Sequence, residues 1–238
     1  MGSNQPSPTK AQPGLIDDAS SGLGLWHARS QLARRQGDTR SALIWCGTEL
    51  LTERGFQTTG IDEILSLVGV PKGSFYYYFK SKREFGLLVV ENYVKFYAEK
   101  MAALFDQPGR NPLDCLRDFV EDCKAGMTKY DFKRGCLIGN MGQELAGLNE
   151  EFRELLEGVL QSWEIRVCTL LALAVDQGVI SEQNDPHSLS RFFWIGWEGA
   201  ILRAKLTRST EPLDLFAKIF FTKVISQQSC HDSEILGV

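Results

Sequence analysis

The 238-residue sequence lacks the features of several protein classes. Its longest uninterrupted apolar run, Leu170 to Val175, has six residues, whereas a membrane-spanning helix needs about 20. The first ten residues, MGSNQPSPTK, contain no apolar core. We therefore expect neither a secretory signal nor a membrane as a partner.

Metal-ligating and catalytic patterns are missing as well. The six cysteines form no C-x-x-C pair, and the histidines are limited to His27, His187 and His231. Structural zinc sites need clustered ligands, so we expect no metal and no cofactor. Neither a Ser-His-Asp arrangement nor a phosphate-binding loop is recognisable. The sequence therefore predicts no catalytic residues, no enzyme activity, and a cytoplasmic protein with reduced cysteines.

Charge is distributed unevenly along the chain. Residues 1–84 carry ten Lys and Arg against eight Asp and Glu, whereas residues 85–238 carry sixteen against twenty-two. Because the net charge of the chain is −4, its whole surface does not suit nucleic acid. A basic front and an acidic rear instead indicate a partner for one half only.

Residues 1–37 are rich in Gly, Pro, Ser and Gln and show no sustained period. We interpret them as a mostly disordered arm. The end of this arm carries Arg29, Arg34 and Arg35. These arginines suit either a solvated tail or contact with phosphate or a minor groove, as in arms beside helix-turn-helix domains. The sequence leaves both interpretations open.

Helical patterns begin directly after the arm. Asp38 or Thr39 can cap a first helix, which ends at Gly55. Thr59 followed by Asp62 is a capping arrangement for a second helix. This short helix and a third are joined by a tight turn, which predicts a helix-turn-helix.

The third of these helices has an unusual composition. Phe75 and Phe79 lie four residues apart and can anchor one face, while Tyr76, Tyr77 and Tyr78 surround the remainder. Lysines flank it on both sides. Aromatic hydroxyls among lysines suit contacts to phosphates and base edges in a major groove. A small buried helix with a solvated basic end is the alternative.

The rear of the chain is helical throughout by its period, with no convincing strand. The helix predicted after Pro186 carries two features of interest. Its small residues recur every four positions and let a partner helix approach closely. With the next helix they suit a four-helix interface between two subunits, and packing within one chain is the alternative. The residues of this predicted interface are Gly196, Ala200, Ala204, Phe216 and Phe220.

The second feature of this helix is its charge. Glu198 and Lys205 are seven residues apart and therefore share a face. Such charges are either solvated or paired across an interface, or they line a cavity in which a cation holds an anionic ligand.

The segment from Arg40 to Phe85 resembles the DNA-binding domain of TetR-type repressors. Its stretches ERGF, TTGIDEIL and VGVPKGSFYYYFKSKREF agree with that family in order, spacing and residue type. The resemblance implies an all-α homodimer, with a three-helix DNA-binding domain at 38–86 and an effector-binding and dimerisation domain at 87–238. It also implies a ligand-responsive repressor, which a small effector releases from a palindromic operator.

Carried over by position, the resemblance assigns the DNA contacts. Thr59 and Gly60 would open the second helix onto phosphate, and Tyr78 and Lys82 would hold the DNA backbone. The residues facing the groove would be Lys72, Gly73, Ser74, Tyr76 and Tyr77.

Two further stretches, RGCLIGNMGQELAGL and FWIGWEGAILRAKL, resemble the acrylate- and electrophile-responsive subgroup of the family, a relative of the regulators of N-ethylmaleimide reductases. The effector would be acrylate, its coenzyme A thioester or a related electrophile. By position, Cys136 matches the thiol in the GCL motif of those sensors, and Lys205 matches a lysine near it. The expected effector or sensing residues are Cys136, Asn140, Trp194, Trp197, Glu198 and Lys205.

Two interpretations of Cys136 stay open. Lys133 and Arg134 precede it, and cationic neighbours lower the pKa of a thiol and favour covalent redox or electrophile sensing. A buried free cysteine instead behaves as a small apolar residue, in which case the effector binds reversibly. A helical protein-interaction module without specific DNA binding is a further alternative.

Overall fold

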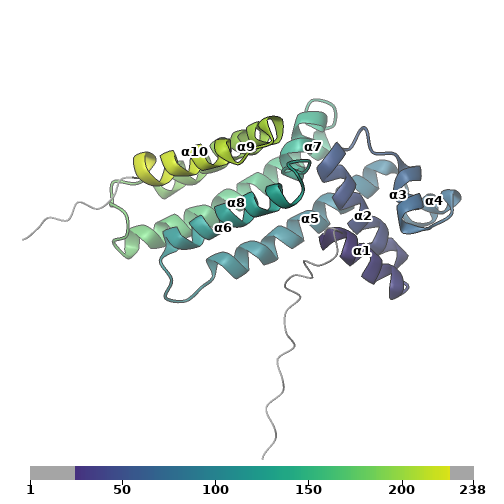
Figure 1. The fold of residues 1–238 in the computed structure, drawn as a ribbon, viewed down its shortest axis with the longest axis horizontal. Coiled ribbons are helices and arrows are strands. Elements are labelled where there is room, and N and C mark those ends of the chain that lie inside the picture. Colours follow the sequence, from purple (N-terminus) through teal and green to yellow (C-terminus); the bar gives the residue numbers. More distant parts are fainter. Residues whose placement is uncertain (1–24, 226–238) are drawn as a thin grey trace, which may run out of the picture.

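A computed structural model describes residues 25–225 of the chain (Figure 1). All regular elements in this range are helices, which confirms the predicted all-α class. We call α1 to α4 and the first turns of α5 the head, and the remainder the body. In chain order the elements are α1 (Leu25–Arg35), α2 (Thr39–Arg54), α3 (Ile61–Val68), the 3-10 turn η1 (Lys72–Ser74), α4 (Phe75–Tyr78), α5 (Lys82–Phe105), α6 (Pro112–Lys129), α7 (Leu137–Leu145), α8 (Glu150–Asp176), α9 (Pro186–Thr207), α10 (Glu211–Ile219) and the π-helical turn η2 (Phe220–Val224).

Two helices of the head begin where local signals place them. Asp38 caps α2 by accepting a hydrogen bond from the backbone N–H of Ser41 (2.9 Å). Ser81 caps α5 by accepting one from the N–H of Glu84 (3.1 Å). Gly55 follows α2 with a φ of +88°, which glycine adopts without a Cβ penalty. These caps satisfy backbone groups that have no partner inside the helix.

The prediction of a disordered arm is wrong for Leu25–Arg35, which form α1 and pack along α2. Trp26 is buried, with its ring in edge contact with Tyr93 and Phe96. The buried hydroxyl of Ser30 donates a hydrogen bond to the carbonyl of Ala42 (2.7 Å). One aromatic anchor and one hydroxyl leave almost no periodic signal in the sequence, which explains the error. The rest of the arm lies outside the described residues.

The start of α3 also differs from the prediction. This helix begins after Gly60, which is extended and offers no side-chain cap. Thr59 is buried, and its hydroxyl donates a hydrogen bond to the carbonyl of Gly55 (2.7 Å). The expected cap between Thr59 and Asp62 is therefore wrong, because the hydroxyl closes the turn after α2 instead.

Helix α5 joins the two parts of the molecule without a linker. Near its start, Phe85 and Val89 pack directly against Gly47 of α2. At its end, the ring of Phe105 contacts that of Phe119 on α6 (centroids 5.6 Å apart). The predicted boundary after residue 86 falls inside this continuous helix, so a movement of the body is passed to the head along a stiff element.

Helix α8 forms the centre of the body and contacts α6, α7 and α9 (Figure 1). Its apolar face is buried, from Phe152 through Trp163 to Ala174. By length and composition it is apolar enough to cross a membrane, alone among the helices of the described range. Because its buried face packs against three neighbouring helices, we interpret it as a core helix.

Candidate DNA-binding surface and effector site

The segment η1–α4 presents an exposed polar surface on a buried anchor. Phe75 and Phe79 are buried, as predicted. Tyr76 and Tyr77 on the same turn are 70% and 84% exposed, and the side chain of Lys72 is 80% exposed. Two phenol hydroxyls and one ammonium group therefore extend from a firmly packed support, where a neighbouring molecule can meet them.

Contacts within the head hold these groups only loosely. The Lys72 ammonium lies 3.2 Å from the carboxylate of Asp62 on α3, and both side chains are mostly exposed. An exposed pair of this kind contributes only ~0–1 kcal/mol, so a phosphate can replace the carboxylate at small cost. Open space surrounds Gly73, and Ser74 is partly exposed. A DNA backbone could therefore approach this turn closely.

The other predicted DNA contacts are placed unequally. Gly60 is exposed at the start of α3, and Tyr78 is half-buried. Lys82 is also half-buried, with its ammonium over the ring of Phe56 (4.9 Å). Thr59 is buried with its hydroxyl bonded inside the head, so the structure does not expose it beside Gly60, and its role at a phosphate stays a prediction.

Two of the three arm arginines are engaged inside the head. The guanidinium of Arg29 lies over the ring of Trp45 (4.8 Å). That of Arg34 donates hydrogen bonds to the hydroxyl of Thr39 (2.9 Å) and the carbonyl of Gly69 (3.4 Å). These residues therefore do not form the solvated tail that the sequence allowed.

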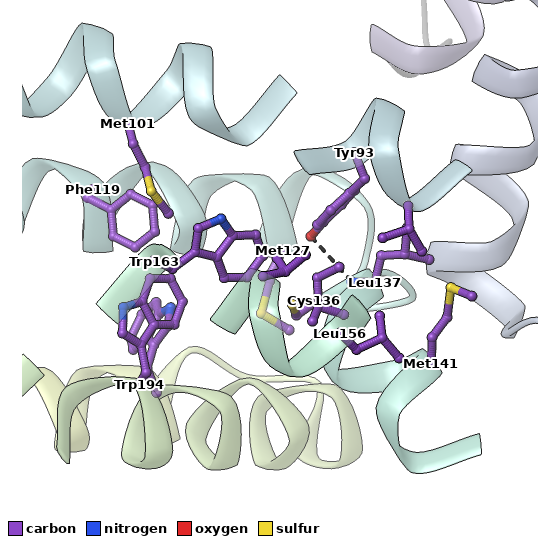
Figure 2. Close-up of a cluster of buried hydrophobic side chains, with 14 of the residues drawn as sticks. Tyr93, Met101, Phe119, Met127, Cys136, Leu137, Met141, Leu156, Trp163 and Trp194 are labelled. Carbon is purple, nitrogen blue, oxygen red and sulfur yellow. Dashed lines mark hydrogen bonds between the residues drawn. The ribbon is translucent and has the colours of Figure 1, made fainter. Parts of the chain in front are cut away.

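A cavity of about 600 Å³ lies in the body, with walls from α1, α5, α6, α8 and α9 and the start of α7. This volume suits a small organic molecule. Figure 2 shows part of its aromatic lining, where the ring of Trp163 contacts those of Trp194 (5.1 Å) and Tyr93 (6.4 Å). Four of the predicted effector residues line this cavity, namely Cys136, Trp194, Trp197 and Glu198.

Two polar atoms of α9 are buried in this lining without a hydrogen-bond partner. They are Nε1 of Trp194 and Oε1 of Glu198, one helical turn apart. Leaving a buried polar group unpaired costs about 1–3 kcal/mol. Both atoms are therefore available to a ligand that enters the cavity.

Cys136 lies at the N-cap of α7 and is buried. Its thiol shares a hydrogen bond with the carboxyl group of Glu198. Burial, and then the charge of Glu198, raise the pKa of this thiol well above its ordinary value. Burial likewise raises the pKa of Glu198 to about 7. The thiol therefore stays protonated at neutral pH, whereas the carboxyl group titrates there.

The prediction that Lys133 and Arg134 lower the pKa of the Cys136 thiol is wrong. The guanidinium of Arg134 turns toward the head, where it pairs with Glu49 of α2. Lys133 is exposed and lies 3.9 Å from Asp131. Adjacency in sequence does not bring these cations to the sulfur, because the chain enters α7 immediately afterwards and the side chains diverge.

Asn140 and Lys205 do not line this cavity, so the structure does not bring them together with the other expected effector residues. The amide of Asn140 donates a hydrogen bond to the carbonyl of Thr52 (2.9 Å). The ammonium of Lys205 donates one to the carbonyl of Glu53 (3.5 Å). Both residues instead connect the body to the last turn of α2.

Glu144, which the sequence analysis missed, completes this connection. Its carboxylate accepts hydrogen bonds from the backbone N–H groups of Phe56 (3.2 Å) and Gln57 (2.8 Å). A side chain at Gly55 would collide with that carboxylate. Gly55 is thus needed for the close approach of head and body as well as for its backbone angle. This glycine at the end of the first predicted helix is the one sequence signal at the connection between head and body.

The small-residue stripe of α9 packs within the chain, as the alternative interpretation of the sequence had it, and its assignment to a dimer interface stays a prediction. Ala204 and Phe220 are fully buried, and Ala200 is nearly so. A side chain at Gly196 would collide with the ring of Phe216 on α10. The stripe holds α10 against α9, and Gly196 and Phe216 remain partly exposed, Phe216 beside a groove between the two helices.

A neighbouring stripe of the same helices is exposed and apolar. Ile195 and Leu206 are 71% and 69% exposed. Exposed apolar patches mark interaction sites. We call this surface the α9–α10 face, and it consists of Phe192, Ile195, Leu202, Leu206, Leu215 and Ile219.

A helix-turn-helix with an exposed basic and aromatic turn, joined by a stiff helix to a domain with a ligand-sized cavity, defines the class of ligand-responsive transcription regulators. Two family models match the chain: "Bacterial regulatory proteins, tetR family" at residues 46–86 and "Tetracyclin repressor-like, C-terminal domain" at residues 112–220. The chain belongs to the TetR family of transcriptional regulators, which are not enzymes.

Curated relatives agree with this assignment. The chain is 45% identical over 179 residues to the transcriptional regulator AcuR of Cereibacter sphaeroides. The aligned residues cover 75% of this chain and 82% of the relative. It is 30% identical to the HTH-type transcriptional repressor DhaR of Mycobacterium sp. (78% and 92% covered). It is also 30% identical to the HTH-type transcriptional repressor NemR of Escherichia coli (74% and 89% covered).

Solved structures show the same fold. A regulatory protein TetR from Rhodobacter sphaeroides is 46% identical, with a TM-score of 0.72 over 75% of this chain and 94% of the other. The reduced form of Escherichia coli NemR is 26% identical, with a TM-score of 0.71 over 81% and 100%.

Proposed function

We propose that the protein is a cytoplasmic repressor that binds a palindromic operator as a homodimer and is released when a small effector enters the cavity. The effector is acrylate, its coenzyme A thioester or a related electrophile. One observation carries this proposal: the exposed η1–α4 turn and the cavity with unpaired polar atoms belong to one continuously packed chain. The relatives DhaR and NemR are named as repressors.

In this proposal the η1–α4 turn enters the major groove. Its base-facing residues are Lys72, Gly73, Ser74, Tyr76 and Tyr77. Gly60 places the N-terminus of α3 against a phosphate, where backbone N–H groups and the helix dipole favour an anion. The half-buried Tyr78 and Lys82 contact the flanking backbone, so that phosphates fix the position and base edges specify it.

Two copies would meet through the α9–α10 face. The same apolar surface on both subunits can form a four-helix interface around a two-fold axis. Such a dimer presents two heads to two half-sites, about 34 Å apart when they are separated by one turn of DNA. This pairing explains why large apolar side chains are exposed there.

Release of DNA would proceed through α7. This helix begins at Cys136, in the cavity wall, and carries Glu144 near its end, where the carboxylate holds the backbone of the head. A ligand that shifts the first turn of α7 therefore moves the attachment of the head. The effector must bind the released conformation more tightly than the DNA-bound one.

Selection of binding sites from random DNA tests the proposed function. Purified full-length protein should enrich an inverted repeat, and each repeat should bind two copies of the chain. Enrichment of an asymmetric sequence would contradict the homodimer, and absence of any enriched sequence would contradict specific DNA binding.

Replacing Glu144 with alanine should uncouple the effector from the DNA. The substitution removes two hydrogen bonds to a charged acceptor, each of which contributes roughly 1.5–3 kcal/mol. We expect the effector to change operator affinity several-fold less than in the wild type, as measured by fluorescence anisotropy with labelled operator. Gln143→Ala, an exposed neighbour on the same helix, is the matched control. An unchanged response in the Glu144 variant would remove α7 from the coupling route.

A further inference from the structure

The carboxyl group of Glu198 makes a close contact with the Cys136 thiol. The expected cationic neighbours of Cys136 do not explain this contact. The carboxyl group shares a hydrogen bond with the thiol. A side chain at Gly139, in the first turn of α7, would collide with this carboxylate. The bare backbone at Gly139 therefore leaves the room in which the carboxylate reaches the sulfur.

Among the described residues no cation acts on the pKa of Cys136 or Glu198, although Arg29, Lys100, Lys129 and Arg134 line the same cavity. The titratable groups that interact with Glu198 or Cys136 are the Cys123 thiol on α6 and the phenols of Tyr93 and Tyr97 on α5. Within residues 25–225 no ion pair involves Glu198, and burial and the Cys136 thiol act on its pKa. Lys100, a half-buried lysine of the cavity wall, pairs with another carboxylate. The pair is thus an acid–base couple in a cavity with an aromatic lining.

We propose that Glu198 is the general base for addition of Cys136 to a neutral α,β-unsaturated carbonyl compound. This inference rests on the proposed effector-controlled function and specifies its chemistry. The thiol gives its proton to the carboxylate while the sulfur electron pair bonds to the β-carbon, and the C=C π electrons move toward the carbonyl oxygen. The protonated carboxyl group then returns the proton to the α-carbon. An S–H bond and a π bond are replaced by an S–C and a C–H bond, with no oxidant and no leaving group.

The structure does not favour a stable thiolate at Cys136. A base that accepts the thiol proton removes the need for one. A nucleophile with a high pKa can react when an adjacent base accepts its proton during the attack. Charge that develops on the sulfur meets the backbone N–H groups of Ile138 and Gly139 at the start of α7, and a helix N-terminus favours negative charge. The unpaired N–H of Trp194, one turn along α9, can bind an acceptor on the remainder of the ligand.

The same geometry selects between the candidate effectors. Free acrylate would bring a second carboxylate beside Glu198, and like charges repel. Two of the cations in the cavity wall, Lys100 and Arg134, are already paired with Asp122 and Glu49. An ester, amide or thioester of the same acid has the same reactive alkene and no charge at the carbonyl group. The neutral derivative should therefore react faster than the acid.

Methyl acrylate and sodium acrylate are matched probes for this selectivity. Full-length protein is incubated with each, and alkylation of Cys136 is followed by mass spectrometry of its peptide. We expect methyl acrylate to modify Cys136 at least tenfold faster than acrylate, beyond their ratio with free glutathione. Equal rates after that correction would overturn the neutral-ligand part of the proposal.

Glu198→Gln tests the base directly, because it keeps the shape and removes the proton acceptor. General base catalysis contributes typically 10²–10⁴-fold, and we expect alkylation of Cys136 by methyl acrylate to slow at least tenfold. Cys168, half-buried on α8 and outside the cavity lining, serves as the internal reference in the same digest. A Glu198→Gln protein that reacts at the wild-type rate would overturn the assignment.

The pH profile separates a base from a residue that only supports the fold. Because the pKa of Glu198 is raised to about 7, its carboxylate is lost as the pH falls through that value. The wild-type rate should therefore rise from about pH 6 and level off above about pH 8, one unit either side of the pKa, whereas the Glu198→Gln rate should rise steadily with thiol ionisation. Identical profiles would overturn the proposal.

Operator binding and thermal melting of both preparations are measured alongside. If the wild type binds no operator, the proposed repressor function fails whatever the alkylation result. If it binds operator and melts normally but Cys136 is not alkylated by either probe, the thiol reaction fails and a reversible cavity remains.

Discussion

Replacing Ile195 with glutamate should convert the dimer into monomers and abolish high-affinity operator binding together. Ile195 is 71% exposed in the single chain and is the most exposed residue of the α9–α10 face. Around a two-fold axis each substitution places two carboxylates in the interface. An uncompensated buried charge costs about 3–5 kcal/mol, which is at least a hundredfold in the dissociation constant. Analytical ultracentrifugation and anisotropy with labelled operator measure the two effects.

Leu148→Glu provides the matched control for this change. Leu148 is 75% exposed and lies between α7 and α8, away from the α9–α10 face. Its substitution should leave the dimer and operator binding intact. If Ile195→Glu remained dimeric with unchanged affinity, the α9–α10 face would not be the subunit interface.

Removal of both Lys72 and Tyr77 side chains should weaken operator binding more than any other change on the head surface. A residue that reads a base edge contributes about 1–3 kcal/mol, and each dimer loses both residues from two heads. The expected loss in affinity for the Lys72→Ala, Tyr77→Ala variant is at least a hundredfold. Binding should also depend less on salt concentration, because a cation near phosphate has been removed.

The fold should tolerate this double change. Both side chains are more than three-quarters exposed, and surface substitutions usually change stability by less than about 0.5 kcal/mol. Lys218→Ala, an exposed lysine on α10, is the control for a lost positive charge. Wild-type affinity in the double variant, at an unchanged melting temperature, would exclude the η1–α4 turn from DNA recognition.

Local signals were sufficient to predict much of the head. Caps such as Asp38 and Ser81 act within one turn of chain, so their effect is visible in the sequence itself. The buried Phe75 and Phe79 were also predictable, because a helical spacing of four defines one face. By contrast α1 depends on Trp26 reaching α5, a contact between distant segments that leaves no local pattern.

The sites were harder to predict than the helices. The intrachain role of the α9 stripe was not predictable, since the sequence does not show that Gly196 makes room for Phe216 rather than for a second subunit. The surroundings of Cys136 depend on Glu198, which the fold brings from a distant helix. The cations beside Cys136 in sequence point elsewhere. Tertiary contacts, not adjacent residues, decide the chemistry of this thiol.

Operator affinity measured with and without an acrylic thioester tests the central claim most directly. The probe is acryloyl coenzyme A, added to wild-type protein bound to its selected inverted repeat, with the saturated propionyl coenzyme A as a comparison. A coupling free energy of 1–3 kcal/mol is typical of allosteric regulators, so we predict at least a fivefold loss of operator affinity with the acrylic thioester. Affinity that stays the same with acryloyl coenzyme A, with acrylate and with methyl acrylate would contradict the account of an effector-released repressor.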